Sequence, residues 1–158
     1  MRYQDQLVKQ TQKAADDICR SALAVPLDKS DWAPGGEARS ALNQMQEVAT
    51  QVAWFLPILR DRQMPDFDEH ARKEAVRIRQ SYDTVEKCVA EVRRSTSELS
   101  QVIATFPDSA MEDEITLPFG GGMVLTMADV LGLPYWNMVY HLGQINQIQL
   151  LLGDREMH

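Results

Sequence analysis

The chain has 158 residues, 44% of them hydrophobic and 25% charged, and a formal net charge of −7. These values are typical of one globular domain, spanning residues 1–158, with its own hydrophobic core. The excess of acidic residues argues against a protein that binds nucleic acid or an anionic membrane surface, since both need clustered Lys and Arg. No apolar run is long enough to span a bilayer, and the first ten residues lack the hydrophobic segment of a signal peptide. We therefore expect a cytoplasmic protein.

Four long helical patterns follow one another along the chain. They cover about Tyr3–Leu23, Glu37–Asp61, Glu69–Phe106 and Thr126–Asp154. In the second and third patterns, apolar residues recur at alternating steps of three and four, which is the seam of a helical bundle. Because this alternation persists from Ala75 to Phe106, we expect the third pattern to be one continuous helix.

The segment between the third and fourth helices has a different pattern. Apolar side chains alternate with others from Ile115 to Phe119, and three glycines, Gly120–Gly122, follow. This predicts a short β-hairpin that turns at the glycines. The glycine run lacks the Lys-Ser/Thr pair of a phosphate-binding loop. The whole chain therefore predicts an all-α protein, a four-helix bundle with a long crossover that carries a short β-hairpin between helices 3 and 4.

The last helix carries polar side chains in an apolar stripe. At about 100° per residue, one face comprises Val130, Leu133, Asn137, His141, Gln144, Ile148 and Leu151. Asn137 and His141 are one turn apart and project toward the same point. Since buried polar groups need partners, three of them in one stripe indicate a site.

Glu47 in the second helix has two interpretations. It shares a face with Trp54 and Ile58, opposite the main seam of that helix. If this face is buried, the carboxylate needs a cation, a donor or a metal. If the face is exposed, Glu47 is a solvated surface acid.

Several short motifs resemble the DinB-like (YfiT-like) superfamily of helical bundles. They are His141-Leu142-Gly143-Gln144-Ile145, Leu151-Leu152-Gly153-Asp154, and Trp32 followed by Ala38-Arg39-Ser40-Ala41-Leu42. The order of three helices, a β excursion and a last helix is also similar, so the resemblance covers nearly the whole chain.

The resemblance implies a divalent metal held by three histidines, one from the second helix and two from the last. Only His141 matches; Asn137 and Glu47 occupy the other two positions. Carboxylate, amide oxygen and imidazole can all bind a metal, which would be Ni, Zn, Mn or Fe. This set is harder than three imidazoles, so it disfavours tight Zn binding. Alternatively, the same residues form a hydrogen-bond network, the relic of a metal site.

Three functional hypotheses follow. The first is a metal-dependent enzyme, similar to thiol-dependent S-transferases in related bundles, with Gln144 and Tyr140 as substrate contacts and Trp136 and Trp54 as pocket walls. No independent nucleophile is evident, since Cys19 and Cys88 have no base nearby in the sequence and are expected to be buried.

The second hypothesis is a non-catalytic bundle, a stress-response protein or one that binds a small molecule, with a relic metal site. The third is a homodimer, suggested by the second half of the helix Glu37–Asp61, which is apolar nearly all round. A homodimer is compatible with either of the other two.

Overall fold

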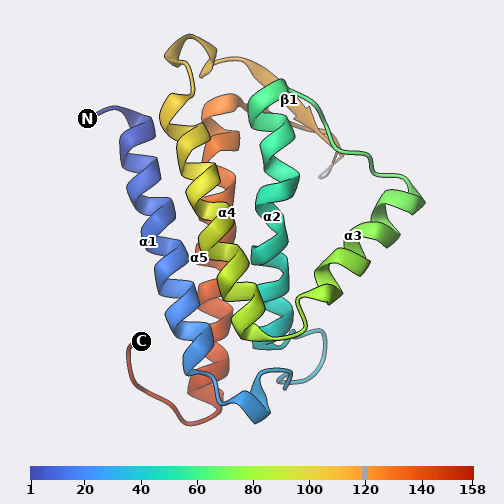
Figure 1. Ribbon diagram of the computed structural model, residues 1–158, viewed down its shortest axis with the longest axis vertical. Helices are drawn as coiled ribbons and strands as arrows, with labels where there is room; N and C mark the ends of the chain where they lie inside the picture. The colour runs from blue at the N-terminus through green and yellow to red at the C-terminus, as the bar shows by residue number, and fades with distance from the viewer. Residues whose placement is uncertain (119–120) are drawn as a thin grey trace.

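A computed structural model describes residues 1–118 and 121–158. Its helices are α1 (Tyr3–Ala24), α2 (Ala41–Asp61), α3 (Glu69–Ser81), α4 (Val85–Thr105) and α5 (Met127–Leu151), with short 3₁₀ turns at Leu27–Lys29 and Asp108–Ala110. An antiparallel hairpin of β1 (Glu114–Leu117) and β2 (Met123–Thr126) precedes α5. The predicted mostly helical fold with a hairpin before the last helix is confirmed (Figure 1).

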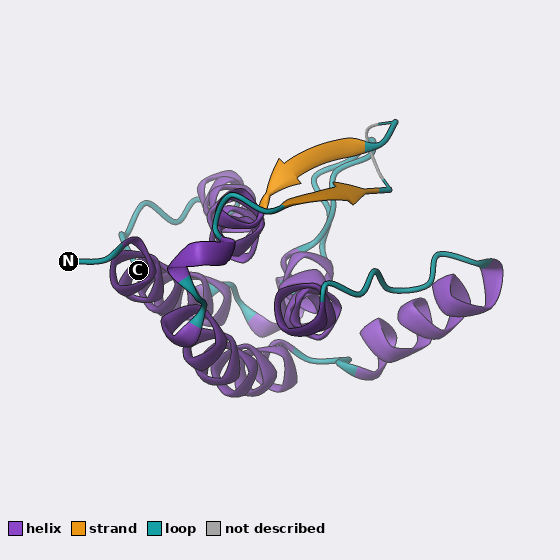
Figure 2. Ribbon diagram, turned by 90° about the horizontal axis from the view of Figure 1, so that it is seen from above, coloured by secondary structure: helices purple, strands orange, loops and turns teal. Residues whose placement is uncertain are grey.

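Four of the helices form the bundle. α1 and α2 each pack against both α4 and α5, so α1 and α2 lie on opposite corners when the bundle is viewed along its length (Figure 2). The apolar faces of the four helices enclose a core of two clusters. One cluster includes Val25, and the other lies beneath the hairpin and includes the fully buried Leu117. Within the described residues, no helix combines the length and hydropathy needed to cross a bilayer.

The prediction of one continuous helix over Glu69–Phe106 was wrong. The chain leaves the helical conformation at Tyr82, and α4 begins after Thr84, whose side chain accepts a hydrogen bond from the Lys87 amide at 3.2 Å. Asp83 and Thr84 compete for backbone donors and so favour a helix start over a helix interior. The apolar period therefore continues across two separate helices.

α3 consequently leaves the bundle. None of its residues is buried, and Ile78, which the period assigned to the bundle seam, is 42% exposed. Its main packing partner among the helices is α2, and it projects from one side of the molecule (Figure 1). α2 itself begins at Ala41 rather than Glu37, because the Ser40 side chain caps it by accepting from the Asn43 amide.

The hairpin pairs Glu114 with Thr126 and Leu117 with Met123. Gly121 and Gly122 in its turn have φ values of +79° and +97°, which favour glycine. Phe119 and Gly120, which were also assigned to the hairpin, lie outside the described residues. Thr126 ends the hairpin and forms a capping box with Asp129, which fixes the start of α5.

The buried face of α5 is rotated relative to the predicted stripe. Val130, His141 and Ile148 are buried, but Leu133, Asn137 and Gln144 are only half-buried and Leu151 is exposed. The centre of the face is a line of Met127, Leu131, Pro134, Met138 and Ile145. Apolar residues occur on every side of α5, so its period does not determine which side faces the core.

Candidate functional site

His141 lies at the junction of α5 and α2, with 1% of its side chain exposed. Its Nε2 is 3.1 Å from Oε1 of Glu47 on α2. The Glu47 side chain is 29% exposed, so Glu47 is partly buried and also partly open to solvent. Both interpretations of Glu47 are thus partly correct.

The other imidazole nitrogen is held by a pair of glutamines. His141 Nδ1 contacts Oε1 of Gln44, and Gln44 Nε2 donates to Oε1 of Gln144. With this amide orientation Nδ1 donates to Gln44, and Nε2 is the nitrogen that faces Glu47. Metal-binding histidines characteristically donate their second N–H to an oxygen in this way.

Arg39 contacts the other oxygen of Glu47. Its Nη1 is 2.6 Å from Oε2, and its Nη2 donates to the Asn43 carbonyl at 2.9 Å. The contact with His141, followed by the hydrogen bond from Arg39, lowers the pKa of Glu47 to about 2 against the opposing effect of burial. Glu47 is therefore ionised throughout the neutral and mildly acidic range.

Asn137 completes the cluster from α5. Its Nδ2 is 3.4 Å from Glu47 Oε1, while its Oδ1 is buried and has no hydrogen-bond partner. The Nε2 of His141 is likewise buried without a hydrogen bond, because its close approach to Glu47 is poorly directed for one. Two buried polar atoms without a well-directed hydrogen bond thus lie beside one carboxylate.

This donor set fits a divalent cation. A metal bonded at about 2.1 Å separates neighbouring ligand atoms by about 3.0–3.4 Å, and the Glu47–His141 separation of 3.1 Å falls in that range. Within residues 1–118 and 121–158, no group of three or more His, Cys, Asp and Glu side chains is placed to hold a metal. The third protein ligand would have to be the amide oxygen of Asn137, which a rotation of the amide brings toward Glu47 Oε1.

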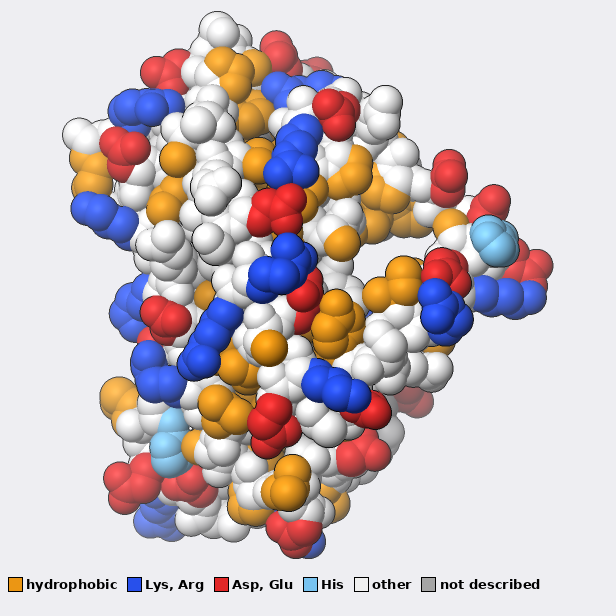
Figure 3. Space-filling view, in the orientation of Figure 1, with side chains coloured by type: hydrophobic (Ala, Val, Ile, Leu, Met, Phe, Trp, Pro, Cys, Tyr) orange, Lys and Arg blue, Asp and Glu red, His pale blue; other side chains and the backbone are white. Residues whose placement is uncertain are grey.

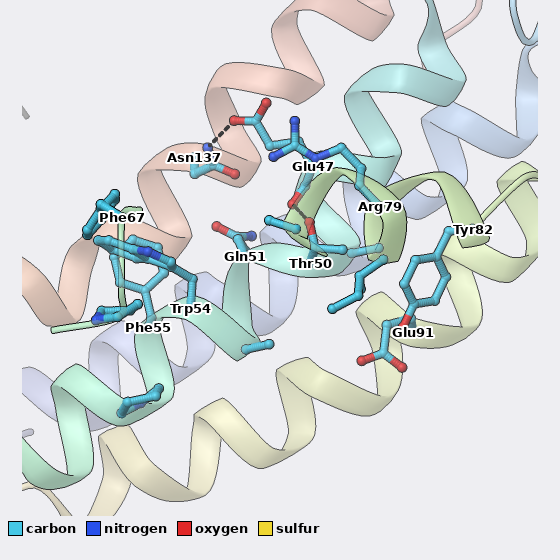
Figure 4. A pocket seen from close by; sticks show the side chains of 16 residues that line it. Glu47, Thr50, Gln51, Trp54, Phe55, Phe67, Arg79, Tyr82, Glu91 and Asn137 are labelled. Atoms are coloured by element: carbon cyan, nitrogen blue, oxygen red, sulfur yellow. Dashed lines mark hydrogen bonds between the residues drawn. The ribbon is translucent and has the colours of Figure 1, made fainter. Parts of the chain in front are cut away.

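A pocket of about 550 Å³ opens beside this cluster. It lies mainly between α2 and α3, where the space-filling view shows a notch bordered by hydrophobic side chains (Figure 3). Glu47 and Asn137 line it together with Thr50, Gln51, Trp54, Phe55, Phe67, Arg79, Tyr82 and Glu91, among others (Figure 4). The displacement of α3 from the bundle therefore creates the pocket.

The other predicted contact residues lie in different places. Trp54 lines the pocket, and Gln144 contacts Gln44 behind the histidine. Trp136 and Tyr140 are 60% and 52% exposed, stack on each other with ring centroids 5.4 Å apart, and do not line the pocket. Their role as substrate contacts stays a prediction.

Two residues of the cluster were missed in the sequence. Gln44 lies three positions before Glu47 on the same face of α2, so helical spacing could have found it. Arg39 precedes α2, and its side chain extends along the first turns of that helix to Glu47. Helical periodicity does not reveal such a contact.

The two cysteines are buried, as predicted, and play no part in the cluster. Burial raises the pKa of Cys19 to about 11 and that of Cys88 to about 12. Both are therefore thiols rather than nucleophilic thiolates at neutral pH.

No protein-family model and no curated protein sequence matches the chain. Solved structures share its fold. YfiT from Bacillus subtilis, described as a probable metal-dependent hydrolase with an unusual four-helix bundle topology, superposes with a TM-score of 0.77 at 13% identity, over 96% of this chain and 88% of YfiT.

Two further structures are similar. An uncharacterized protein from Clostridium difficile 630 has a TM-score of 0.73 at 8% identity, over 96% of this chain and 98% of that one. The DinB-like protein YjoA from Bacillus subtilis has a TM-score of 0.59 at 17% identity, over 97% of this chain and 95% of YjoA. The chain thus has the fold of YfiT and of a DinB-like protein along nearly its whole length, as the sequence motifs predicted.

Proposed function

We propose that this protein is a metal-dependent enzyme in which Glu47, Asn137 and His141 bind a divalent cation and the adjoining pocket holds an organic substrate. The observation that carries the proposal is the pair of buried polar atoms, His141 Nε2 and Asn137 Oδ1, that lack a well-directed hydrogen bond and lie beside an ionised carboxylate. Buried polar atoms without partners are rare in proteins, and a cation would satisfy both of them.

When bound, the metal would lower the pKa of a coordinated water or thiol to near neutrality and so supply a nucleophile. The surrounding residues would prepare its ligands. Gln44 fixes the His141 ring with Nε2 toward Glu47, and Arg39 fixes the Glu47 carboxylate.

We propose hydrolysis as the reaction, because YfiT, with the same fold, is described as a probable metal-dependent hydrolase. A thiol nucleophile, as in an S-transferase, is the alternative at the same centre. The mixed oxygen and nitrogen set favours Mn, Fe or Ni over tightly bound Zn.

Elemental analysis of protein purified without chelators tests the proposal. We expect about one equivalent of a transition metal, or uptake of one on titration, in the wild type and in the control variant His70→Ala. His70 is exposed on α3, away from the cluster. The variant His141→Ala should bind less than about a tenth as much. Equal metal content in the two variants would contradict the proposal.

One observation favours a non-catalytic ligand-binding protein with a relic metal site. Arg39 already neutralises Glu47 at 2.6 Å, which reduces the attraction of the cluster for a cation. In that case thermal unfolding would shift with organic ligands but not with any divalent metal, since only a bound ligand stabilises the native state.

A further inference from the structure

Buried polar atoms without partners are concentrated around the pocket. Among the described residues, seven buried side-chain nitrogen and oxygen atoms have no hydrogen-bond partner, and five of these belong to Gln51, Arg79, Asn137 and His141. A cation would account for the atoms of Asn137 and His141. Both amide atoms of Gln51 and the Nε of Arg79 remain without partners.

Gln51 lines the pocket from α2 and is 7% exposed. Its Nε2 and Oε1 are both unpaired, so it offers one donor and one acceptor side by side. A ligand that satisfies both must itself present an acceptor and a donor at neighbouring positions. An N-acyl amino acid in an extended conformation does so with its amide N–H and one carboxylate oxygen, which lie on the same edge of its backbone.

The unpaired charge of the pocket is positive. Glu47, Arg79 and Glu91 are the charged residues in its lining. Arg39 pairs with Glu47 at 2.6 Å, and Arg94 pairs with Glu91 at 2.7 Å. In the part of the chain that the structure describes, Arg79 has no ion pair, and its side chain extends from α3 toward the end of the pocket where Glu47 and Asn137 lie (Figure 4). This guanidinium favours an anionic group, and a carboxylate matches its planar fork.

The remaining wall is apolar. Trp54 makes edge contacts with Phe55 and Phe67, with ring centroids 4.8 Å and 5.9 Å apart, and Ile78 faces the same space from α3. A pocket of about 550 Å³ is the size of an ordinary small-molecule site. It therefore accommodates an aromatic or branched acyl group beside the polar end.

We propose that the pocket binds an N-acyl amino acid, with the apolar acyl group against Trp54. Its amide N–H donates to Gln51 Oε1, and its carboxylate accepts from Gln51 Nε2 and Arg79. This deepens the proposed function and rests on it only for the fate of the amide. On hydrolysis, the water oxygen bonds to the amide carbon, the C–N bond breaks and a water proton moves to the nitrogen. The products are a carboxylic acid and an amino acid.

Calorimetric titration of metal-free protein in a chelating buffer tests binding separately from metal chemistry. The probes are N-benzoylglycine, its neutral amide N-benzoylglycinamide, and 4-phenylbutanoate, which keeps the carboxylate but lacks the amide. We expect N-benzoylglycine to bind about tenfold more tightly than the neutral amide and about fivefold more tightly than 4-phenylbutanoate.

Two variants assign these preferences to residues. Arg79→Gln should abolish the preference over the neutral amide, while the control Arg77→Gln should keep it, because Arg77 pairs with Glu74 on the same helix and does not line the pocket. Gln51→Leu should abolish the preference over 4-phenylbutanoate.

The proposal is overturned if N-benzoylglycine does not bind, if it binds no more tightly than the neutral amide, or if Arg77→Gln and Arg79→Gln reduce the preference equally. A protein that binds no metal but shows the expected ligand preferences would refute the proposed function and support this inference. A protein that binds the metal but shows none of the expected ligand preferences would refute this inference and leave the proposed function standing.

Discussion

Replacing Glu47 with Gln removes the charge on which the cluster depends. The contacts with His141 and Arg39 lower the pKa of Glu47 from its ordinary value of 4.5 to about 2. A shift of this size corresponds to about 3 kcal/mol, which solvent screening of the partly exposed carboxylate reduces to roughly 1–3 kcal/mol. The folded protein has the lower pKa, so this stabilisation is present above pH 4.5 and is lost as the pH falls toward 2.

Urea unfolding of metal-free wild type and Glu47→Gln, followed by circular dichroism at several pH values, measures this contribution. We expect Glu47→Gln to lower the free energy of unfolding by about 1–3 kcal/mol at pH 7, and the difference to shrink progressively below pH 4.5. The control Glu112→Gln alters an exposed acid and should change stability little at any pH. A Glu47→Gln protein as stable as wild type at pH 7, or a difference independent of pH, would refute the reasoning.

Three further predictions follow from the cluster and the surface. Asn137→Asp should tighten Mn²⁺ binding in a calorimetric titration about tenfold by replacing an amide with a carboxylate ligand; weaker binding would exclude Asn137 as a ligand. Cys19 and Cys88, with pKa values raised to about 11 and about 12 by burial, should not react with a thiol reagent at pH 8 until the chain unfolds; rapid labelling of the native protein would contradict their burial. The chain should sediment as a homodimer that Trp136→Glu dissociates, because Trp136 is 60% exposed; a wild-type monomer would disprove it.

The proposed dimer surface differs from the one expected from sequence. The second half of α2 is apolar nearly all round, but Phe55, Leu56, Ile58 and Leu59 are buried within the chain itself. The exposed apolar residues lie instead on α5, where Trp136 stacks on Tyr140 beside the exposed Val139. An apolar helix surface indicates contact with a neighbour, but it does not distinguish a neighbouring helix from a second chain.

The bundle could be predicted because its helices combine apolar periodicity with clear ends. Thr126 and Asp129 form the capping box that their spacing indicates, and Gly153 ends α5 with a φ of +90°. The break at Tyr82–Thr84 was missed because the apolar period runs across it unchanged. Its signal was local, a Thr that caps the following helix.

The candidate site could be predicted only in part. Helical spacing brings Asn137 and His141 to one point, and the family resemblance directed attention to Glu47. Arg39 and Arg79 could not be found in this way, because long flexible side chains reach the cluster or the pocket from outside the helix faces that periodicity defines. The pocket itself depends on α3 leaving the bundle, which no periodic pattern reveals.

The most direct measurement of the central claim is a nitrogen-15 NMR spectrum of the histidine side chains during titration with Zn²⁺. The chain has three histidines, and His70 and His158 are exposed and lie outside the cluster, so each signal can be assigned by substitution. The account predicts that His141 is protonated at Nδ1 before metal is added, and that about one equivalent of Zn²⁺ shifts its Nε2 signal. A His141 ring without a proton on Nδ1, or an Nε2 signal unchanged at saturating Zn²⁺, would contradict the proposed metal site.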